Sequence, residues 1–433
     1  MPDKTKCPVF ICFNNKIKDG GSFLPAGVWF FEVNKEEQIT RTKVCSPLSI
    51  EAITYDGQEN NYGRLLKFKT TKGTWKSWAM PMELLKGSGD ELRGELLAMG
   101  LQITPGSKAR NLLSNYLQIN PPIKQIRCAL QVGWCGDSFV LPDKVYGKES
   151  DNIIFQSGER GYEEYTQAGT LVGWRDDIAA LAVNNPILTI AISAAFAAPL
   201  AKKCNAESGG FHFVGDSSIG KSSALEAACS IWGGENFKRS WRTTANGMEG
   251  AAVLFNDCLL ALDEISECDP KDIGAIVYAL GNGRGKQRAT RSGNARGVNR
   301  WRSFVLSTGE RTITTSMNEG GHRSKAGQSV RLIDMPTKRT HGIYDVLHGH
   351  VSGQALSDSL KKAATKHYGV TGRYFLEKLT QDKRNFSEYL ERIKNNHSFK
   401  AVEPQHKRVA ARFELGLVFW TDKAGGGSLG RQT

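Results

Sequence analysis

One segment of the chain has the residue types and the spacing of a loop that holds phosphate groups. Gly215, Gly220, Lys221 and Ser222 fill the pattern G-x-x-x-x-G-K-[ST]. In such a loop backbone N–H groups surround the phosphates, the lysine reaches the terminal phosphates, and the hydroxyl binds Mg²⁺. We therefore expect ATP and Mg²⁺ as cofactors. The expected nucleotide-binding residues are Gly215, Asp216, Ser217, Ser218, Ile219, Gly220, Lys221, Ser222 and Ser223.

Two adjacent carboxylates follow this loop at the end of an apolar segment. The segment 258–266, CLLALDEIS, ends in Asp263 and Glu264. Together with Ser222, Asp263 is expected to bind Mg²⁺, and Glu264 is expected to polarise the attacking water as a general base. Alone, the pair would equally fit two solvated acids at the end of a buried strand. Their place behind a phosphate-binding loop favours a catalytic role.

Further groups that can act on a terminal phosphate follow the acids. Either Ser307 or Thr308, at the end of the apolar segment 301–306, is expected to lie between the acids and the phosphate. Arg331, before the apolar segment 332–335, is the favoured residue to stabilise charge on a neighbouring subunit's phosphate. Arg323 is the second candidate, and an ordinary surface arginine stays open.

Residues 281–303 form a basic segment that contains no acidic residue. Ser292, Gly293 and Asn294 indicate a turn in its middle, so a basic β-hairpin is expected. Such a hairpin could follow the phosphates of a nucleic-acid strand, while a solvated basic loop is the alternative. The net charge of +13 also favours a polyanionic partner. The expected DNA contacts are Lys286, Arg288, Arg291 and Arg296.

These groups meet only if strands and helices bring them to one edge of a sheet. Residues 211–214 read as a buried parallel strand and residues 223–231 as the helix after the loop. We therefore expect an α/β P-loop NTPase core of AAA+ type with a parallel sheet, an α+β domain before it and a helical region after it. The expected divisions are 1–150 (α+β domain), 151–203 (helical linker packing on the core), 204–345 (ATPase core) and 346–433 (helical region).

The remaining composition narrows the class of protein. The nine cysteines form no C-x-x-C pair, and no histidine cluster completes a zinc pattern, which argues for a reducing bacterial cytoplasm. The apolar stretch 187–201 is too short for a membrane span and contains Pro199, so we expect a buried helix and no membrane partner. The aromatics Trp29, Phe30, Trp75 and Trp78 of the first domain are expected in its core, with base stacking as the alternative.

Several stretches together carry a family resemblance. The chain resembles the prophage and mobile-element family of predicted superfamily II helicases and inactivated derivatives. Its ATPase part is similar to the self-loading, MCM-like AAA+ helicases of staphylococcal cassette elements. The resembling stretches are CSPLSIEA (45–52), QVGWCGDSFVLP (131–142), GDSSIGKSSALEAACSIWG (215–233), SWRTTANGMEGAA (240–252), LLALDEI (259–265), YALGNGRGKQRATR (278–291), WRSFVLSTGE (301–310) and AGQSVRLIDMP (326–336).

The resemblance implies an ATP-driven DNA helicase acting in replication of a phage or mobile element. It also implies a homo-oligomer, expected to be a hexameric ring on single-stranded DNA. After Arg412 and Phe413 the sequence departs from the family pattern, and we expect a truncated or altered C-terminal end. The alternatives are an inactive nucleic-acid-binding derivative of the same fold and a packaging-type ATPase.

Overall fold

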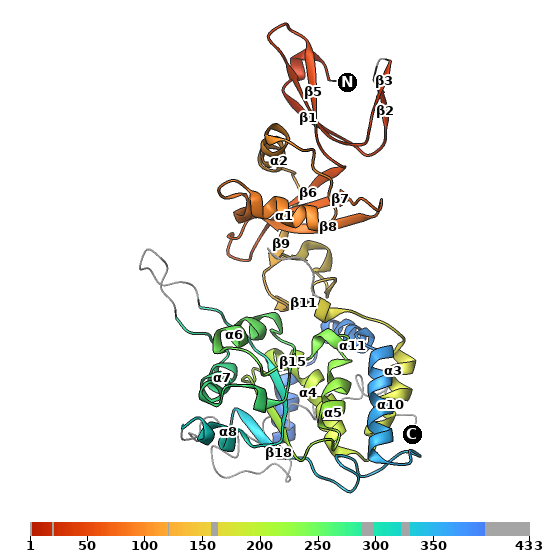
Figure 1. Cartoon of the computed structure of the whole chain (residues 1–433), viewed down its shortest axis with the longest axis vertical. Helices are drawn as coiled ribbons and strands as arrows, with labels where there is room; N and C mark the ends of the chain where they lie inside the picture. The colour runs from red at the N-terminus through yellow and green to blue at the C-terminus, as the bar shows by residue number, and fades with distance from the viewer. Residues whose placement is uncertain are drawn as a thin grey trace. The chain divides into compact units, whose positions relative to one another are not determined.

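The chain folds into two compact units (Figure 1). The computed structural model describes residues 2–19, 21–119, 121–156, 163–287, 298–321 and 330–394. The first unit comprises Met1–Leu130 and Glu149–Gly161, and the second comprises Gln131–Lys148 and Tyr162–Thr433. Residues 131–148 therefore belong to the second unit, although the sequence analysis assigned them to the first domain.

In its described residues the first unit combines two larger sheets and one two-stranded sheet with two α-helices. The three-stranded sheet has the order β1-β4-β5 and the five-stranded sheet the order β13-β9-β6-β7-β8. Leu66 and Phe68 of β7 and Trp78 of β8 lie in a core shared with the helices. The elements are β1 (Val9–Phe13), β2 (Ile17–Asp19), β3 (Ser22–Leu24), β4 (Gly27–Val33), β5 (Ile39–Cys45), β6 (Leu48–Tyr55), β7 (Gly63–Lys69), β8 (Trp75–Pro81), α1 (Asp90–Ala98), α2 (Ser107–Ile119), β9 (Gln125–Ala129) and β13 (Ile153–Phe155).

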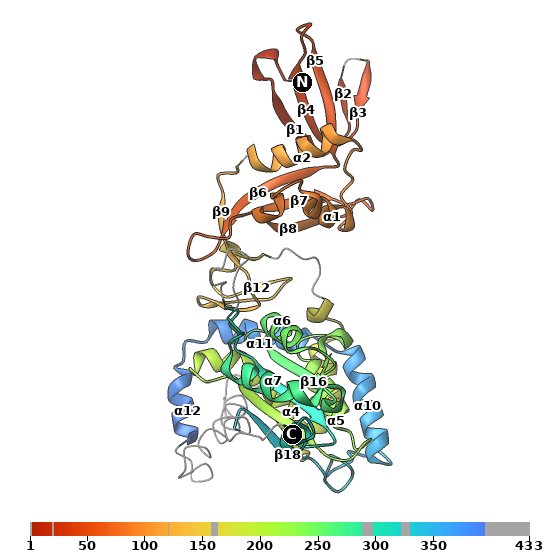
Figure 2. The ribbon, with the colours of Figure 1, turned by 60° about the vertical axis from the view of Figure 1, so that its left-hand side comes forward.

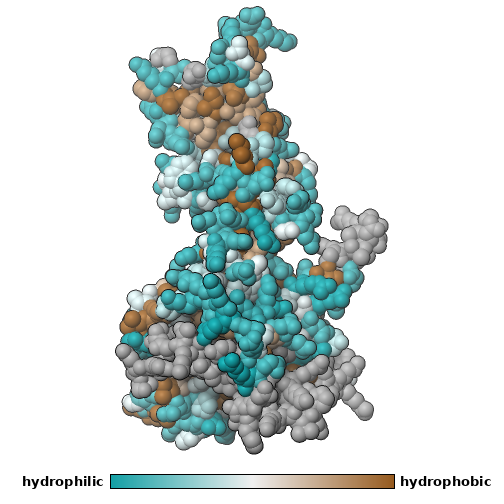
Figure 3. Space-filling view, turned by 180° about the vertical axis from the view of Figure 1, so that it is seen from behind, coloured by the Kyte–Doolittle hydropathy of each residue, from teal (hydrophilic) through white to brown (hydrophobic). Residues whose placement is uncertain are grey.

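A second, smaller apolar cluster lies on the three-stranded sheet. It contains buried Leu24, Trp29 and Phe31, with the partly buried Val9 and Ile11 packed against it. Figure 3 shows apolar side chains gathered over the end of the first unit that carries this sheet. Part of this sheet's apolar surface therefore remains exposed.

The second unit is built on a parallel sheet of order β15-β16-β17-β14-β18, which confirms the predicted parallel sheet. In Figure 1, α6, α7 and α8 lie on one side of it and α5 and α10 on the other. Covering both faces explains why its strands are apolar almost throughout. The strands are β14 (Gly209–Val214), β15 (Arg239–Ser240), β16 (Leu259–Asp263), β17 (Phe304–Gly309) and β18 (Leu332–Pro336); a small antiparallel sheet adds β10 (Gly133–Cys135), β11 (Ser138–Val140) and β12 (Val145–Tyr146).

The helices of the second unit follow the sequence pattern. Two helices precede the strands of the sheet in the sequence, α3 (Leu171–Asp177) and α4 (Pro186–Lys203). The helices between the strands are α5 (Lys221–Cys229), α6 (Ala245–Leu254), α7 (Pro270–Asn282) and α8 (Ile313–Glu319). The C-terminal helices are α10 (Gly353–Lys366), α11 (Val370–Gln381) and α12 (Phe386–Lys394), and Figure 2 shows α10 and α12 at opposite sides of the unit in that view. Residues 395–433, including the departure after Phe413, lie outside the described residues.

The apolar stretch predicted as a buried helix is α4. It is long and apolar enough to cross a membrane, but 72% of its 18 residues are buried inside the protein. It packs on α5 and on β16 and β17. The helix runs through Pro199 to Lys203, so Pro199 does not end it. Its hydrophobicity therefore serves the core that supports the sheet.

A buried chain of hydrogen bonds fastens three strands of this sheet. His212 of β14 lies opposite Ser307 of β17, and its Nδ1 is 2.8 Å from the Ser307 hydroxyl. That hydroxyl accepts from Trp241 Nε1 at 2.8 Å, directly after β15. Because the backbone oxygen of Arg311 only accepts, His212 donates from Nε2 at 2.9 Å and accepts at Nδ1. Every donor and acceptor in this series of hydrogen bonds therefore has its partner only when the His212 imidazole is neutral.

We expect the stability of the protein to depend on His212 below neutral pH. Burial lowers the pKa of His212 to about 4, and the nearby Lys221 charge acts in the same direction. Because the unfolded histidine titrates near 6.5, the neutral folded form stabilises fully above that pH and loses its contribution as pH falls towards 4. From pH 7 to 5 the loss is about 2 kcal/mol. Chemical denaturation of wild type and His212→Asn, whose amide replaces Nδ1, should show a flatter pH slope in the variant; equal slopes would contradict this role.

Candidate nucleotide site

The candidate phosphate-binding loop connects β14 to α5 through residues 215–220. Gly220 has φ of +106° where α5 begins, a conformation that favours glycine. At Gly215 an added Cβ would lie 2.5 Å from the end of the Ile219 side chain, which would have to move to make room. The backbone conformation therefore favours glycine at position 220, whereas position 215 is closely packed against a side chain.

Lys221 folds back into the loop. Its Nζ donates to the backbone oxygens of Gly215 at 2.7 Å and Asp216 at 2.6 Å, and the residue is 6% exposed. Burial lowers the pKa of Lys221, while nearby carboxylates, Glu264 foremost, act in the opposite direction. The loop thus surrounds a partly desolvated ammonium group.

Asp263 joins the loop helix to the end of β17. Its Oδ1 accepts from Ser222 Oγ at 3.1 Å and from Thr308 Oγ1 at 2.6 Å. Burial acts to raise the pKa of Asp263, but the Thr308 hydrogen bond and the Lys238 charge outweigh it and hold the pKa below its usual range. An ionised carboxylate beside a hydroxyl is a donor set that suits Mg²⁺.

Lys238 is a member of this site that the sequence analysis missed. It lies just before β15, and its Nζ is 3.1 Å from Asp263 Oδ2 and 2.9 Å from Glu226 Oε1 of α5. Burial acts to lower the pKa of Lys238, but the two carboxylates outweigh it and raise the pKa. No motif marks this lysine; only the parallel pairing of β15 with β16 brings it to Asp263.

Glu264 turns away from the strand that carries it. Its φ is +57°, which is uncommon for a residue with a side chain. Its backbone N–H donates to Thr308 Oγ1 at 3.2 Å, and its carboxylate accepts from the Ser266 hydroxyl at 2.7 Å. This half-buried carboxylate lies at the carboxyl end of β16, next to Asp263.

The structure separates the alternatives Ser307 and Thr308. Neighbouring residues of a strand face opposite sides of its sheet. Thr308 bonds Asp263, whereas Ser307 is held by His212 and Trp241. Lys221, Ser222, Asp263, Glu264 and Thr308 are therefore brought together, and the Ser307 hydroxyl is not among them.

Arg331 lies away from this group within the chain. It precedes β18, which runs parallel to β14, so it is at the opposite end of the sheet from the loop. Its guanidinium lies 4.6 Å from the Tyr278 ring centroid and donates to Asn282 Oδ1 at 2.7 Å, both on α7. Arg323 lies outside the described residues.

The basic segment is described only at its two flanks. Arg284 and Arg300 pair in an antiparallel bridge, and Gly285 N–H donates to the Asn299 oxygen at 3.0 Å. The backbone N–H of Lys286 donates to Glu249 of α6 at 3.1 Å, and the Lys286 side chain is exposed. The other three expected DNA contacts, Arg288, Arg291 and Arg296, lie outside the described residues.

A segment after β18 covers the loop, and sequence patterns did not indicate it. Thr337 N–H and hydroxyl both bond the Val214 oxygen, at 2.9 and 3.0 Å. Ile343 N–H donates to the Ile219 oxygen at 2.9 Å, and a Cβ on Gly342 would lie 2.4 Å from that oxygen. This covering segment, residues 337–344, is therefore bonded to both ends of the loop.

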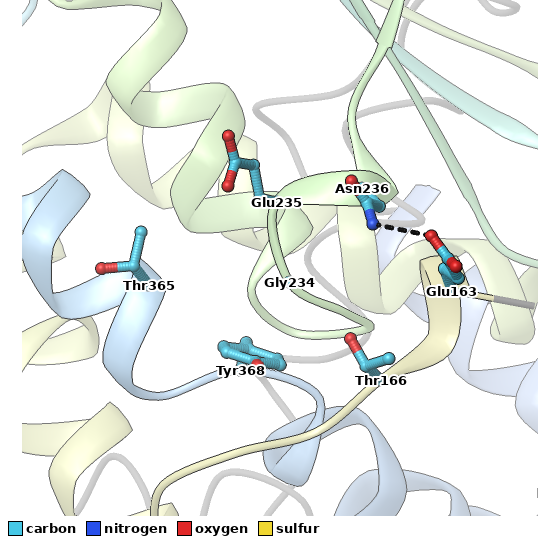
Figure 4. A pocket seen from close by; sticks show the side chains of 7 residues that line it. All are labelled: Glu163, Thr166, Gly234, Glu235, Asn236, Thr365 and Tyr368. Atoms are coloured by element: carbon cyan, nitrogen blue, oxygen red, sulfur yellow. Dashed lines mark hydrogen bonds between the residues drawn. The ribbon is translucent and has the colours of Figure 1, made fainter.

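A pocket of about 390 Å³ lies elsewhere in the second unit (Figure 4). Asn236 and Glu163, joined by a 3.3 Å hydrogen bond, form one side of it, and Thr365 lies at the other. The rest of its lining is Thr166, Gly234, Glu235 and Tyr368. It shares no residue with the group around Asp263.

Comparisons with solved structures identify a similar fold. The chain is similar to a structure described as "SCCmec type IV Cch - active helicase", with 19% identity, a TM-score of 0.68, and coverage of 93% of this chain and 73% of that one. At this identity the similarity concerns the fold alone, which this chain shares with that structure.

Two structures of the NrS-1 C-terminal region match more weakly. One has 10% identity, a TM-score of 0.35 and coverage of 84% and 72%; the other has 8% identity, 0.30, and 86% and 88%. Neither supports a functional statement. A search of curated proteins finds no match.

The family comparison covers parts of both units. The sequence pattern described as "Domain of unknown function (DUF927)" matches residues 19–300, well over half of the chain. The matched range contains the loop, Lys238, Asp263 and Glu264. On this match, the chain belongs to the DUF927 family.

Proposed function

We propose that the second unit is an AAA+-type ATPase whose hydrolysis of ATP drives movement along DNA. The observation that carries the proposal is the shared Asp263 carboxylate. Through it, Ser222 of the loop helix and Thr308 of the neighbouring strand meet at one acid. The helicase fold of the similar structure supports the same function.

The residues of the site fit a nucleotide with its metal ion. The loop N–H groups and Lys221 would hold the phosphates, and Ser222 with Asp263 would hold Mg²⁺. When bound, Mg²⁺ neutralises charge on the phosphate oxygens. Within the chain, Lys238 fixes the second oxygen of Asp263 and so directs Oδ1 toward Ser222.

Glu264 and Thr308 are assigned to the water and the terminal phosphate. As general base, Glu264 would take a proton from the attacking water onto its carboxylate. Its left-handed backbone and its bond to Ser266 position that carboxylate beyond the strand end. Thr308 donates to the Asp263 carboxylate and accepts from the Glu264 N–H, so it would hold the two acidic residues in fixed positions relative to each other.

The proposed motor works as a ring of identical subunits in the bacterial cytoplasm. Arg331, braced on Tyr278 and Asn282 at the far end of the sheet, would complete a neighbour's site. We propose a hexamer, with the basic segment and Lys286 on single-stranded DNA. The antiparallel flanks of that segment support a hairpin anchored on α6.

Replacement of Glu264 by glutamine tests the hydrolytic reaction. The amide cannot accept the proton, so turnover should fall at least a hundredfold, since general-base catalysis contributes about 10²–10⁴-fold. ATP binding should persist, because no loop residue changes. Phosphate release and binding of a fluorescent ATP analogue would be measured on the same preparation. Hydrolysis at the wild-type rate would sink the assignment, whereas binding without hydrolysis in the wild type would identify an inactive derivative.

Replacement of Lys238 by methionine tests its role at Asp263. Loss of the ammonium leaves Asp263 and Glu226 without their shared cation, so we expect kcat to fall about tenfold, or ~1.4 kcal/mol of activation energy. The KM for ATP should change less, because Lys238 does not contact the loop. Lys238→Arg should recover most of kcat. Lys362→Met, at an exposed lysine of α10, serves as control. Wild-type kcat in Lys238→Met would contradict the role.

A further inference from the structure

The four aromatic residues that the sequence pattern indicates in the first unit differ in their exposure to solvent. Trp29 and Trp78 are buried, at 8% and 9% exposure, and Phe30 is half-buried. Trp75, at the start of β8, is 44% exposed. An exposed indole contributes little to the core. The residues around Trp75 therefore have to be considered to explain its position on the surface.

Strand register shows which residues share a face with Trp75. Trp75 lies opposite Lys69, and Ser77 lies opposite Lys67, in the antiparallel pair β7 and β8. Because facing residues in such a pair lie on one side of the sheet, both lysines share the face of Trp75. Lys67 Nζ is 5.7 Å from the Trp75 ring centroid, within cation–π range.

The segment of the sequence that contributes Trp75 and these lysines carries only basic charges. Between Glu59 and Glu83 the sequence contains no acidic residue. Among the residues that the structure describes, none of the lysines in this stretch forms an ion pair. Glu51 of β6 is the nearby exposed acid, and it accepts from Ser49, which pairs with Lys67. The basic residues of the stretch are Arg64, Lys67, Lys69, Lys72 and Lys76, of which Arg64 is buried.

We propose that this stacking face, formed by Lys67, Lys69, Lys72 and Trp75, binds single-stranded nucleic acid. Trp75 would stack on one base, and the lysines on the strands and on the 70–74 turn would contact the flanking phosphates. A single strand is the occupant that fits, because bases in a duplex are already stacked on each other. The site is on the first unit and does not depend on ATP hydrolysis by the second.

Another reading of the lysines concerns the edge of the sheet. β8 is an edge strand and carries Lys76, and lysines on edges discourage pairing with strands of other molecules. Lys67 and Lys69 lie on β7, inside the sheet, so they could serve this role only from the neighbouring strand. That role needs charge alone and makes no use of an exposed indole. The two readings therefore differ in what happens when Trp75 is changed and the lysines are kept.

The chain offers a matched control for Trp75. Phe23 of β3 is 57% exposed, and Lys16 Nζ lies 4.2 Å from its ring centroid. Its partner across the β2–β3 pair is Lys18, so the Phe23 ring lies beside two lysines. Phe23 thus reproduces an exposed ring beside lysine side chains, but on a different sheet from the stacking face.

The test is binding of a fluorescent oligo(dT) to the full-length protein without ATP, over a range of salt concentrations. Trp75→Ala should weaken binding roughly five- to hundredfold, the usual value of one stacked base, and Trp75→Phe should recover most of it. Lys67→Ala with Lys69→Ala should reduce the salt slope by about 1.4, at roughly 0.7 per phosphate contact. Phe23→Ala should bind as wild type. Thermal unfolding of each variant would verify the fold.

Three outcomes would overturn the proposal: wild-type binding by Trp75→Ala, equal loss in Phe23→Ala, or no recovery in Trp75→Phe. Equal competition by polyglutamate and oligo(dT) would also overturn it, since this would identify a general anion surface. Because no ATP is present, these outcomes are independent of whether Glu264 supports hydrolysis.

Discussion

The arrangement of the second unit depends on one carboxylate, that of Asp263, and on the groups that keep it ionised. Its oxygens bond three elements that are far apart in the sequence: the loop helix through Ser222, the neighbouring strand through Thr308, and the segment before β15 through Lys238. Burial alone would raise the pKa of Asp263 and favour its neutral form, and the Thr308 hydrogen bond and the Lys238 charge act against this. The charge that suits a metal ion is therefore a property of the whole sheet edge.

Parallel strands make this convergence possible. All strands of the central sheet end at the same edge, so a loop after β14 and an acid after β16 meet although β17 lies between them. The residues of β17 use both faces of the strand. Thr308 serves the acids, while Ser307, one residue earlier, ties the strand to His212 and Trp241. The covering segment 337–344 then holds the loop from its other side.

The first unit has a different physical character. It buries Trp29, Phe31 and Trp78, yet it leaves Trp75 in solvent among lysines that lack acidic partners in the described part of the chain. The proposed motor would gain from a second contact with the nucleic acid, because such a contact slows dissociation. A stacking face on this unit and a basic segment on the other would divide the two kinds of contact, with bases and with phosphates.

The sequence alone predicted a nucleotide-binding chemistry, because the motifs that indicate it are local in the chain. Residue type and spacing are enough to recognise the lysine and serine that follow two spaced glycines. The same holds for the two acids that follow an apolar strand. Apolar runs likewise predicted the parallel sheet and the buried helix α4. The choice between Ser307 and Thr308 required the tertiary structure, since strand direction and register decide which hydroxyl faces the acid. Lys238, the covering segment and the exposure of Trp75 also emerged only there, because each depends on contacts or burial between segments that no local pattern encodes.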